Sequence, residues 1–422
     1  MGLNSPENGG RAGAPASDAD AGAAVEPGGP APAVAPGARV PAISRGAPAP
    51  ATAPGALVLA IDAGNSKTDV ALVGADGSVL GTARGGGFRP PAVGTGAAVD
   101  ALERTVRRAA RAAGPGTGAL PYAVHVAACL ANADLPVEER QLREALHERG
   151  WGSTTDVVND TFAVLRSGVD EPRGVAVVCG TGINCVGLLP DGRTARFAAL
   201  GRLSGDWGGG AELAEEALWC AARAADGRGG PTALATALPA HFGLPDMGAL
   251  IEALHLGRVP RARRREIPPL LFATAAAGDP VARSLVRRQA EEIVALAAVA
   301  LSRLGLLGEE APVVLGGSVL AARHPLLLDG ITAALAARAP KAVPRVVTEP
   351  PVLGAALLGL DRTGAGPEAA ARLRAHFARA DRPADGGLRS RPGPGDAPAG
   401  APADGAADGP GDGNAAGRPL LR

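Results

Sequence analysis

Between about residues 57 and 360 the chain alternates hydrophobic runs with short polar turns that contain glycine. Short apolar runs bounded by such turns predict buried strands, and apolar residues at helical spacing predict amphipathic helices. In the first half the pattern predicts strands at 57–61, 69–73, 78–82, 124–131 and 156–158, and helices at 96–112 and 138–149. In the second half it predicts strands at 174–179, 185–189, 193–197 and 312–315, and helices at 210–226, 280–305 and 325–338.

Both halves begin with the same module of strand, polar glycine turn, strand, Asp-Gly turn and strand. Gly64 and Gly77 are 13 residues apart in the first copy, and Gly180 and Gly192 are 12 apart in the second. Two such modules about one domain apart indicate internal duplication and an α/β fold. We therefore expect a first domain over residues 56–168 and a second over 169–362.

The ends of the chain have a different composition. Of the 422 residues, 61 are glycine and 38 are proline. Residues 1–55 are rich in Ala, Gly and Pro and lack periodicity, so they bury too little apolar area to offset the entropy of ordering. We predict a disordered tail there, and a helical end followed by a second disordered tail over residues 363–422.

Charge and cysteine content exclude several classes of partner. Lys and Arg total 42, as do Asp and Glu, so the net charge is zero and nothing favours nucleic acid or an anionic membrane. The apolar stretch 293–307 is interrupted by Ser302 and Arg303, which predicts a buried helix rather than a membrane span. Four cysteines without paired spacing predict structural thiols in a cytoplasmic protein, with neither a disulfide framework nor a zinc site.

The turn after the first strand carries phosphate-binding chemistry. Ser66 and Thr68 offer hydroxyl donors, Lys67 is one of only two lysines in the chain, and Asp62 adds a carboxylate suited to Mg²⁺. An ordinary hairpin turn is the alternative. The turn is not a Walker A loop, because Ser66 rather than glycine precedes Lys67 and a strand follows.

A second glycine turn, Gly180-Thr181-Gly182, ends the first strand of the second half. A dinucleotide fingerprint would open a helix, whereas this turn leads into a hairpin, so a second phosphate-facing turn fits better. Asn159-Asp160 lies at the junction of the halves. Asp160 can cap the next helix, accept a proton from a substrate hydroxyl, or do both.

Three further segments have alternative interpretations. Asp206 follows Gly205 and either organises a turn or faces a polyol. Gly316-Gly317-Ser318 follows a buried strand and either lets a base or ribose approach the backbone or starts a helix. The basic run 261–265 is expected to be a solvated helix face rather than a phosphate patch.

In this order the turns resemble the actin-like phosphotransferase superfamily, and within it the N-acetylglucosamine kinase branch of the BadF/BadG/BcrA/BcrD-type ATPase family. The resemblance spans residues 57–360 and rests on six segments: 62–68, 159–160, 179–184, 205–206, 316–318 and 351–356. It implies two ribonuclease-H-like domains around a central cleft. It also implies a kinase that uses ATP and Mg²⁺ to phosphorylate a hydroxyl of N-acetylglucosamine or a related amino sugar.

The resemblance also implies a role for each matching residue. Asp160 would be the catalytic base and Asp62 would organise Mg²⁺. Phosphate contacts would come from Ser66, Lys67, Thr68, Thr181 and Gly182, and adenosine contacts from Gly316, Gly317 and Ser318. The sugar would contact Asn184, Gly201 and Asp206.

Two departures from the family pattern bear on the substrate. An Asn-containing sugar loop is replaced by Gly87–Pro91, where Arg89 suggests a different or an anionic substituent on the sugar. Trp207 stands where an acidic residue is usual, and an aromatic ring can stack on a sugar. Two other functions stay open: an ATPase that activates a partner enzyme through a cysteine-bound iron–sulfur cluster, and a non-catalytic nucleotide-binding regulator. A homodimer is also possible.

Overall fold

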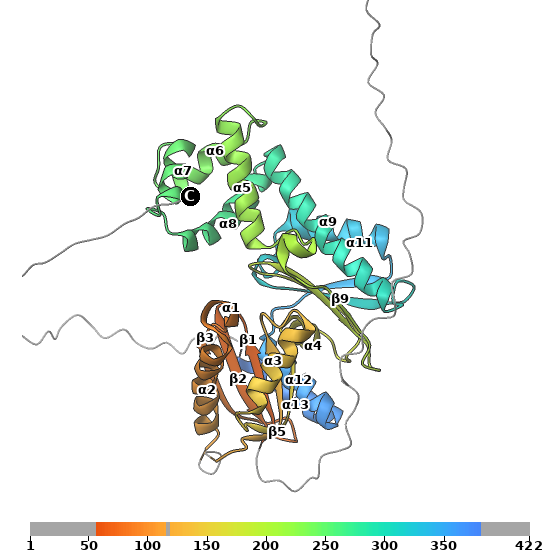
Figure 1. Ribbon diagram of the computed structural model, residues 1–422. Coiled ribbons are helices and arrows are strands. Elements are labelled where there is room, and N and C mark those ends of the chain that lie inside the picture. The colour runs from red at the N-terminus through yellow and green to blue at the C-terminus, as the bar shows by residue number, and fades with distance from the viewer. Residues whose placement is uncertain (1–55, 115–118, 381–422) are drawn as a thin grey trace, which may run out of the picture. The chain divides into compact units, whose positions relative to one another are not determined.

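The computed structural model describes residues 56–114 and 119–380 (Figure 1). The two tails predicted to be disordered lie outside the described residues, apart from the helical end up to residue 380. No helix of the described part is long and apolar enough to cross a membrane.

Five strands form the first sheet, in the order β3-β2-β1-β4-β5. They are β1 (Ala56–Ala63), β2 (Lys67–Val73), β3 (Val79–Gly86), β4 (Ala123–Leu130) and β5 (Gly152–Asn159). The first three strands pair antiparallel, whereas β4 and β5 run parallel to β1. All five expected strands are present, but β1, β2, β3 and β5 are longer than expected.

The second sheet repeats this arrangement with the order β10-β9-β6-β7-β8. Its strands are β6 (Gly174–Cys179), β7 (Ile183–Leu188), β8 (Thr194–Arg196), β9 (Ala311–Gly316) and β10 (Ala342–Val346). Again three strands pair antiparallel and two run parallel to the first. The matching topology confirms the predicted α/β fold with a duplicated module.

Most helices lie between these strands or follow the last one. In the first half they are α1 (Pro90–Val93), α2 (Thr95–Ala112), α3 (Pro136–His147) and α4 (Thr161–Ser167). In the second half they are α5 (Gly210–Ala225), α6 (Leu234–His241), α7 (Met247–His255), α8 (Ile267–Ala276), α9 (Pro280–Arg303), α10 (Ser318–Ala321) and α11 (Pro325–Arg338). Two more, α12 (Pro351–Thr363) and α13 (Pro367–Ala380), end the described chain, and the 3₁₀-helices are η1 (Gly201–Ser204) and η2 (Arg261–Glu266).

Alternating side chains of the first sheet enter two separate cores. Leu59 and Ile61 of β1 pack in the core that α2 and α3 cover, and Val58 and Ala60 pack in the core that contains α4 and α12. Successive residues of a strand point to opposite faces, so a strand covered on both sides is apolar throughout. This explains why the first apolar run has no polar alternation.

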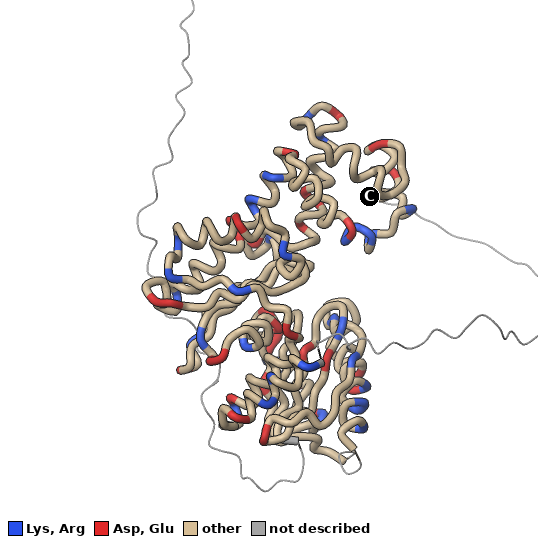
Figure 2. The backbone as a smooth tube through the Cα atoms, turned by 180° about the vertical axis from the view of Figure 1, so that it is seen from behind, with Lys and Arg blue, Asp and Glu red and all other residues tan. Residues whose placement is uncertain are grey.

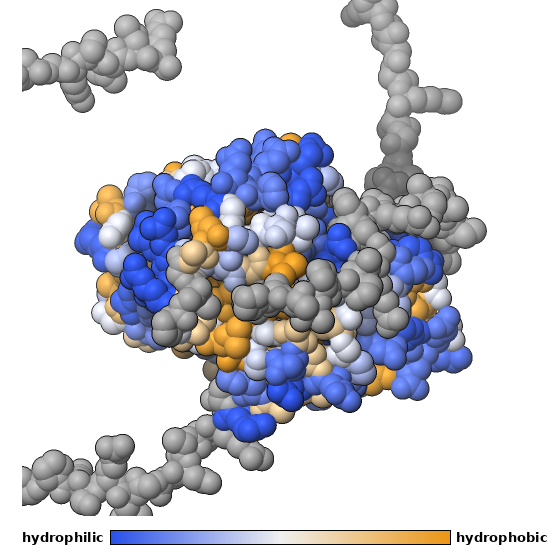
Figure 3. Space-filling model, turned by 90° about the horizontal axis from the view of Figure 1, so that it is seen from below, coloured by the Kyte–Doolittle hydropathy of each residue, from blue (hydrophilic) through white to orange (hydrophobic). Residues whose placement is uncertain are grey.

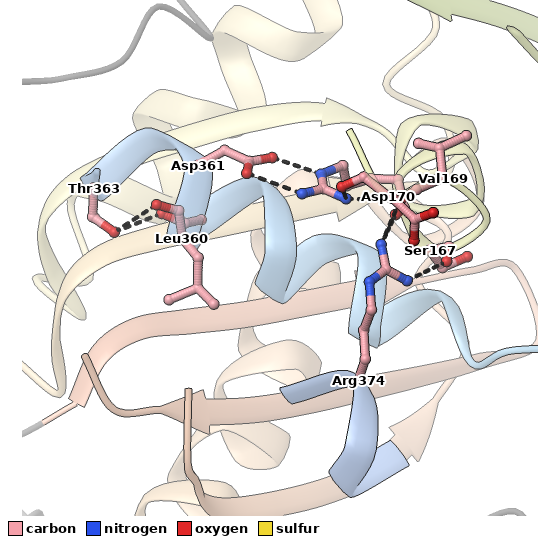
Figure 4. Close-up of polar contacts among 9 residues, drawn as sticks. Ser167, Val169, Asp170, Leu360, Asp361, Thr363 and Arg374 are labelled. Atoms are coloured by element: carbon pink, nitrogen blue, oxygen red, sulfur yellow. Dashed lines mark hydrogen bonds and ion pairs between the residues drawn. The ribbon is translucent and has the colours of Figure 1, made fainter. Parts of the chain in front are cut away.

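Helix α12 returns the chain to the first sheet, where it packs on β1 and β4. Its Asp361 forms a two-pronged ion pair with buried Arg166 of α4, at 2.7 and 3.1 Å (Figure 4). From α13, Arg374 donates a hydrogen bond of 2.8 Å to the carbonyl of Ser167 at the end of α4. Charged side chains thus join α12 and α13, the last two helices of the described chain, to α4 of the first half.

The face drawn in Figure 3 is mainly hydrophilic, and its hydrophobic residues occur in small separate groups.

In the second half, α9 packs on β6 and β7 and buries Ile293 and Val294 completely. The buried helix expected over 293–307 is therefore present, although it ends at Arg303. Leu304 and Leu306 remain buried beyond it.

Candidate functional site

The first glycine turn closes tightly between β1 and β2. The amide of Gly64 donates to the carbonyl of Lys67 at 2.9 Å, and Asn65, Ser66 and Lys67 are exposed. Within the described residues, the amides of Asn65 and Ser66 donate no hydrogen bond. Consecutive free N–H groups at a turn form a concavity that suits an anion.

The side chains of this turn are partly engaged. Lys67 Nζ lies 3.5 Å from Asp69 Oδ2, and Arg84 Nε binds the same carboxylate at 2.6 Å. The hydroxyl of buried Thr68 donates to the carbonyl of Gly86 at 2.8 Å. Lys67 is half exposed and shares its acidic partner, so its ammonium remains accessible to a ligand.

The second glycine turn is also closed by the amide of its first glycine, and more residues support it. Gly180 N donates to Gly182 O at 3.0 Å, and Thr181 and Gly182 are exposed with amides that have no acceptor among the described residues. The first amides of α5, from Gly210 and Ala211, donate to the carbonyls of Gly180 and Thr181 at 2.8 and 2.9 Å. The first amides of α5, which have no partner within the helix, thus fix the turn by donating to its carbonyls.

Gly209 and Gln289 fix the other side of this turn. Gly209 has φ +86°, and a Cβ there would lie 2.4–2.5 Å from backbone atoms of Gly182, so only glycine fits. The Gly209 amide donates to Oε1 of fully buried Gln289 at 2.9 Å. Gln289, on α9, was missed by sequence reasoning because a lone glutamine in a long helix carries no signal.

The third glycine segment meets the second half's first strand. Gly317 has φ +89°, and a Cβ there would lie 2.5 Å from the carbonyl group of Cys179. This close contact places Ser318, the first residue of α10, beside the end of β6. Gly316 ends β9 next to Val178. The glycines therefore permit the close approach of two strand ends, and Ser318 is exposed.

A cavity of about 500 Å³ brings several of the predicted residues together. Its wall includes Gly180, Thr181 and Ser318, but not Gly316 or Gly317. The cavity is also lined by η2, a 3₁₀-helix without buried residues, so the solvated helix face expected at 261–265 is present. Three arginines of this segment line the cavity: Arg261, Arg264 and Arg265.

Two carboxylates lie at the ends of β1 and β5, the two first-sheet strands that flank β4. Asp62 is buried near the end of β1, where burial and the charge of Asp160 raise its pKa to about 8. Asp160 follows β5, and burial raises its pKa to about 6 although the backbone amide of Thr161 opposes this shift. The Asp160 side chain does not cap α4; Asn159 Oδ1 accepts from Thr161 N at 2.9 Å instead.

A chain of amide and carboxyl groups crosses from the first half to the second. Asn159 Nδ2 donates to Asp134 at 2.7 Å, and Asn159 Oδ1 accepts from Asn184 Nδ2 at 3.1 Å. Burial and the charge of Asp160 raise the pKa of Asp134 to about 7. The predicted residues Asp160 and Asn184 therefore lie at the same junction, because Asn184 binds Asn159, which directly precedes Asp160.

Asn132 is a further residue that sequence reasoning missed. Its amide donates to Asn65 Oδ1 at 3.0 Å and to the carbonyl of Phe88 at 3.3 Å. It thereby ties the first glycine turn to the Gly87–Pro91 loop, in a backbone conformation with φ +63°. A signal was present, because polar residues that directly follow a parallel strand often belong to a site.

The other predicted sugar residues lie in two separate places. Gly201 and Asp206 share one turn, where Asp206 N donates to Gly201 O at 3.0 Å. Arg89 is exposed at the start of α1. Trp207 is only 4% exposed and packs in the second-half core beneath Arg288, so its suggested stacking on a sugar is wrong. The apolar surroundings of the ring explain its position.

Metal-ligand clusters and reactive thiols are not a feature of the described residues. No group of three or more His, Cys, Asp or Glu side chains there could hold a metal ion. All four cysteines are free, and three are buried. Burial raises the pKa of the Cys179 thiol to about 12 and that of Cys129 above its ordinary value. These positions agree with structural thiols.

Comparisons with known proteins were made for sequence and structure. Among curated proteins, the chain is 25% identical over 240 residues to an N-acetylmuramic acid/N-acetylglucosamine kinase of Clostridium acetobutylicum, covering 56% of this chain and 76% of the relative. It is 29% identical over 206 residues to an N-acetyl-D-glucosamine kinase of Dictyostelium discoideum, covering 48% of this chain and 64% of that one.

Solved structures share the fold. A candidate N-acetylglucosamine kinase from Chromobacterium violaceum superposes with a TM-score of 0.57 at 24% identity, covering 74% of this chain and 100% of that one. Another from Porphyromonas gingivalis gives a TM-score of 0.51 at 20% identity, covering 73% and 98%. Residues 59–359 match the family model described as the BadF/BadG/BcrA/BcrD ATPase family. The chain therefore belongs to the BadF/BadG/BcrA/BcrD ATPase family.

Proposed function

We propose that this protein is an ATP-dependent kinase that phosphorylates a hydroxyl of N-acetylglucosamine or a related amino sugar. The names of its curated relatives support this substrate class. Use of ATP and the presence of four free cysteines, which stay reduced in the cytosol, are consistent with a cytoplasmic enzyme.

The observation that carries the proposal is the environment of Asp160. Its carboxyl is partly buried at the end of a strand beside the junction of the two halves, and its side chain caps no helix. A pKa of about 6 keeps it mainly ionised at neutral pH yet basic enough to accept a proton. A partly buried carboxylate that caps no helix and has a raised pKa is suited to general base catalysis.

The two glycine turns are proposed to bind the phosphates of ATP. The free amides of Ser66 and Thr181 and the ammonium of Lys67 supply donors for negatively charged oxygens. The hydroxyl of Thr68 would join them by exchanging its hydrogen bond to the Gly86 carbonyl for one to a phosphate oxygen. Gly182 keeps the second turn open for close approach. Phosphoryl transfer needs mainly positioning and charge neutralisation, which donors of this kind supply.

Asp62 is proposed to hold Mg²⁺, directly or through water. The buried Asp62 carboxyl has a raised pKa and acidic neighbours, so a divalent cation would stabilise its charged form. Magnesium in kinases is commonly held by one or two carboxylates and the substrate phosphates, which needs no larger protein cluster. When bound, the ion supplies charge neutralisation at the phosphates.

For the sugar we propose contacts from Asn184 at the junction and from Gly201, Asp206 and Arg89. The amide of Asn184 is held by Asn159, so its orientation is fixed before a ligand arrives. In the reaction, the sugar oxygen forms a bond to the γ-phosphorus, the bond from that phosphorus to the β–γ bridging oxygen breaks, and ADP leaves. The hydroxyl proton passes to the Asp160 carboxylate.

The test is a coupled ADP-release assay with a panel of hexoses and amino sugars, followed by identification of the sugar phosphate by mass spectrometry. Asp160→Asn should lower kcat by about 100- to 10,000-fold, because general base catalysis contributes that much. ATP binding, measured by calorimetry, should be retained. Asp329→Asn is the matched control, since Asp329 is exposed on α11.

Full activity of Asp160→Asn would refute the assignment of the base. ATP hydrolysis without transfer to any sugar would favour the partner-activating ATPase. ATP binding without turnover would favour a regulator.

A further inference from the structure

The cavity beside the second glycine turn has two chemically different walls. One is apolar, with Pro268, Phe272 and Val319, and the ring of His324 stacks on Phe272 with centroids 4.0 Å apart and planes 6° from parallel. A cavity of about 500 Å³ with a flat aromatic pair suits a small ligand that has a planar ring. This wall fits the base of a nucleotide.

The other wall is basic and comes from η2, the short segment before α8 whose arginines are blue in Figure 2. Arg261, Arg264 and Arg265 line the cavity, and Glu215 is the only acidic residue among its lining residues. The charged side chains of this wall therefore give the cavity a net charge of +2, although the whole chain is neutral.

The ion pairs of η2 separate its arginines into two groups. Arg263 pairs with Glu266 at 2.9 Å, and Arg264 pairs with Glu215. Arg261 and Arg265 make no ion pair or hydrogen bond through their side chains with any described residue, and both are exposed at the cavity. The Nε of Arg264 is buried without an acceptor among the described residues. The exposed guanidinium donors of Arg261 and Arg265 are thus left for a ligand.

We propose that Arg261 and Arg265 bind phosphate groups of the nucleotide, so that the site selects nucleoside di- and triphosphates over unphosphorylated nucleosides. The inference rests on the proposed function, because it assumes that the cavity holds ATP. The planar guanidinium fork matches two phosphate oxygens at once, and charge-assisted hydrogen bonds of this kind are stronger than neutral ones. The neighbouring Thr181 turn supplies further phosphate donors at the same cavity.

The experiment is calorimetric titration of the full-length protein with ATP, ADP and adenosine. The variants are R261A, R265A and the double variant. Each single substitution should raise the Kd for ATP about tenfold, and the double variant should raise it about 100-fold. Binding of adenosine should not change. Higher salt should weaken ATP binding less in the double variant than in the unsubstituted protein.

Arg338→Ala is the matched control. Arg338 is exposed in the last turn of α11, lies outside the cavity, and has no ion pair with any residue of the described chain. Failure of the unsubstituted protein to bind ATP would refute the proposed function as well as this inference. Normal ATP binding by the double variant, or an equal loss of ATP and adenosine binding, would refute the inference alone.

Discussion

Replacing Gly209 by alanine tests whether the second glycine turn depends on the loop behind it. Gly209 has φ +86° and ψ 167°, a conformation that costs other residues about 1–3 kcal/mol. The added Cβ would also lie 2.4 Å from the carbonyl carbon of Gly182, where ordinary contacts begin at 3.4 Å. The turn must therefore move by about 1 Å, since both atoms belong to the backbone.

Gly94→Ala supplies a control with the same backbone strain. Gly94 has φ 84° and ψ 151°, also directly precedes a helix, and has nothing within 4 Å of an added Cβ. In urea unfolding, the shared backbone strain should lower the free energy of unfolding by about 1–3 kcal/mol in each variant. Gly209→Ala should lose more than this, because its Cβ also clashes with Gly182. Misplacing a reacting group by 1 Å can cost about 100-fold in rate, so kcat/KM for ATP should fall about that much in Gly209→Ala alone.

The reasoning is refuted if the two variants have equal stability and equal kcat/KM for ATP. That result would mean that a Cβ at Gly209 does not displace Gly182, or that the Gly180–Gly182 turn does not bind phosphate. A stability difference without an ATP effect would separate these cases, because it would keep the contact and remove the phosphate role.

Two further predictions concern the first half. Arg166→Met should lower the free energy of unfolding by about 3–5 kcal/mol in urea titrations, because it removes a guanidinium that is only 3% exposed and pairs with Asp361. Arg228→Met, at an exposed ion pair, should have little effect. Similar losses in both variants would contradict the role of the Arg166–Asp361 pair. His125 is buried with a lowered pKa, opposed by Asp156 at 3.7 Å and assisted by Arg362. The unfolded chain therefore takes up a proton that folded His125 resists, and stability should fall as the pH drops through about 6.5, less steeply in H125Q; equal slopes would show that His125 does not contribute.

Local sequence signals predicted every described strand except β10, but they did not predict all strand lengths. The hydrophobic runs and the repeated Asp-Gly turns identified nearly every strand of both sheets, because buried strands need apolar residues throughout. Strand β3 extends to Gly86 although Arg84, Gly85 and Gly86 have low strand propensity. Pairing of Gly86 with Lys67 imposes the extended conformation, and this tertiary contact is not visible in a local window.

The candidate site was predictable where its residues lie in glycine turns and not where distant residues support them. Asn132 and Asn65 are 67 positions apart, and Gln289 and Gly209 are 80 apart, yet each pair shares a hydrogen bond. The basic run at 261–265 is exposed as expected, but its position beside a cavity was not predictable, because charge alone does not show which segments pack nearby. Trp207 was considered for sugar stacking because its burial depends on the packing of α9 and α5.

The two glycine turns both expose free backbone amides, but different residues hold them in place. This difference assigns them separate roles in binding. The first turn is joined through Asn132 to the Phe88 loop, so its position is linked to the loop that faces the proposed sugar substituent. The second turn is joined through Gly209 and Gln289 to α5 and α9, which belong to the half that contains the basic cavity. Substitutions at Asn132 should therefore change the sugar KM, and substitutions at Gln289 should change the ATP KM. A reversed pattern would contradict this division of the site.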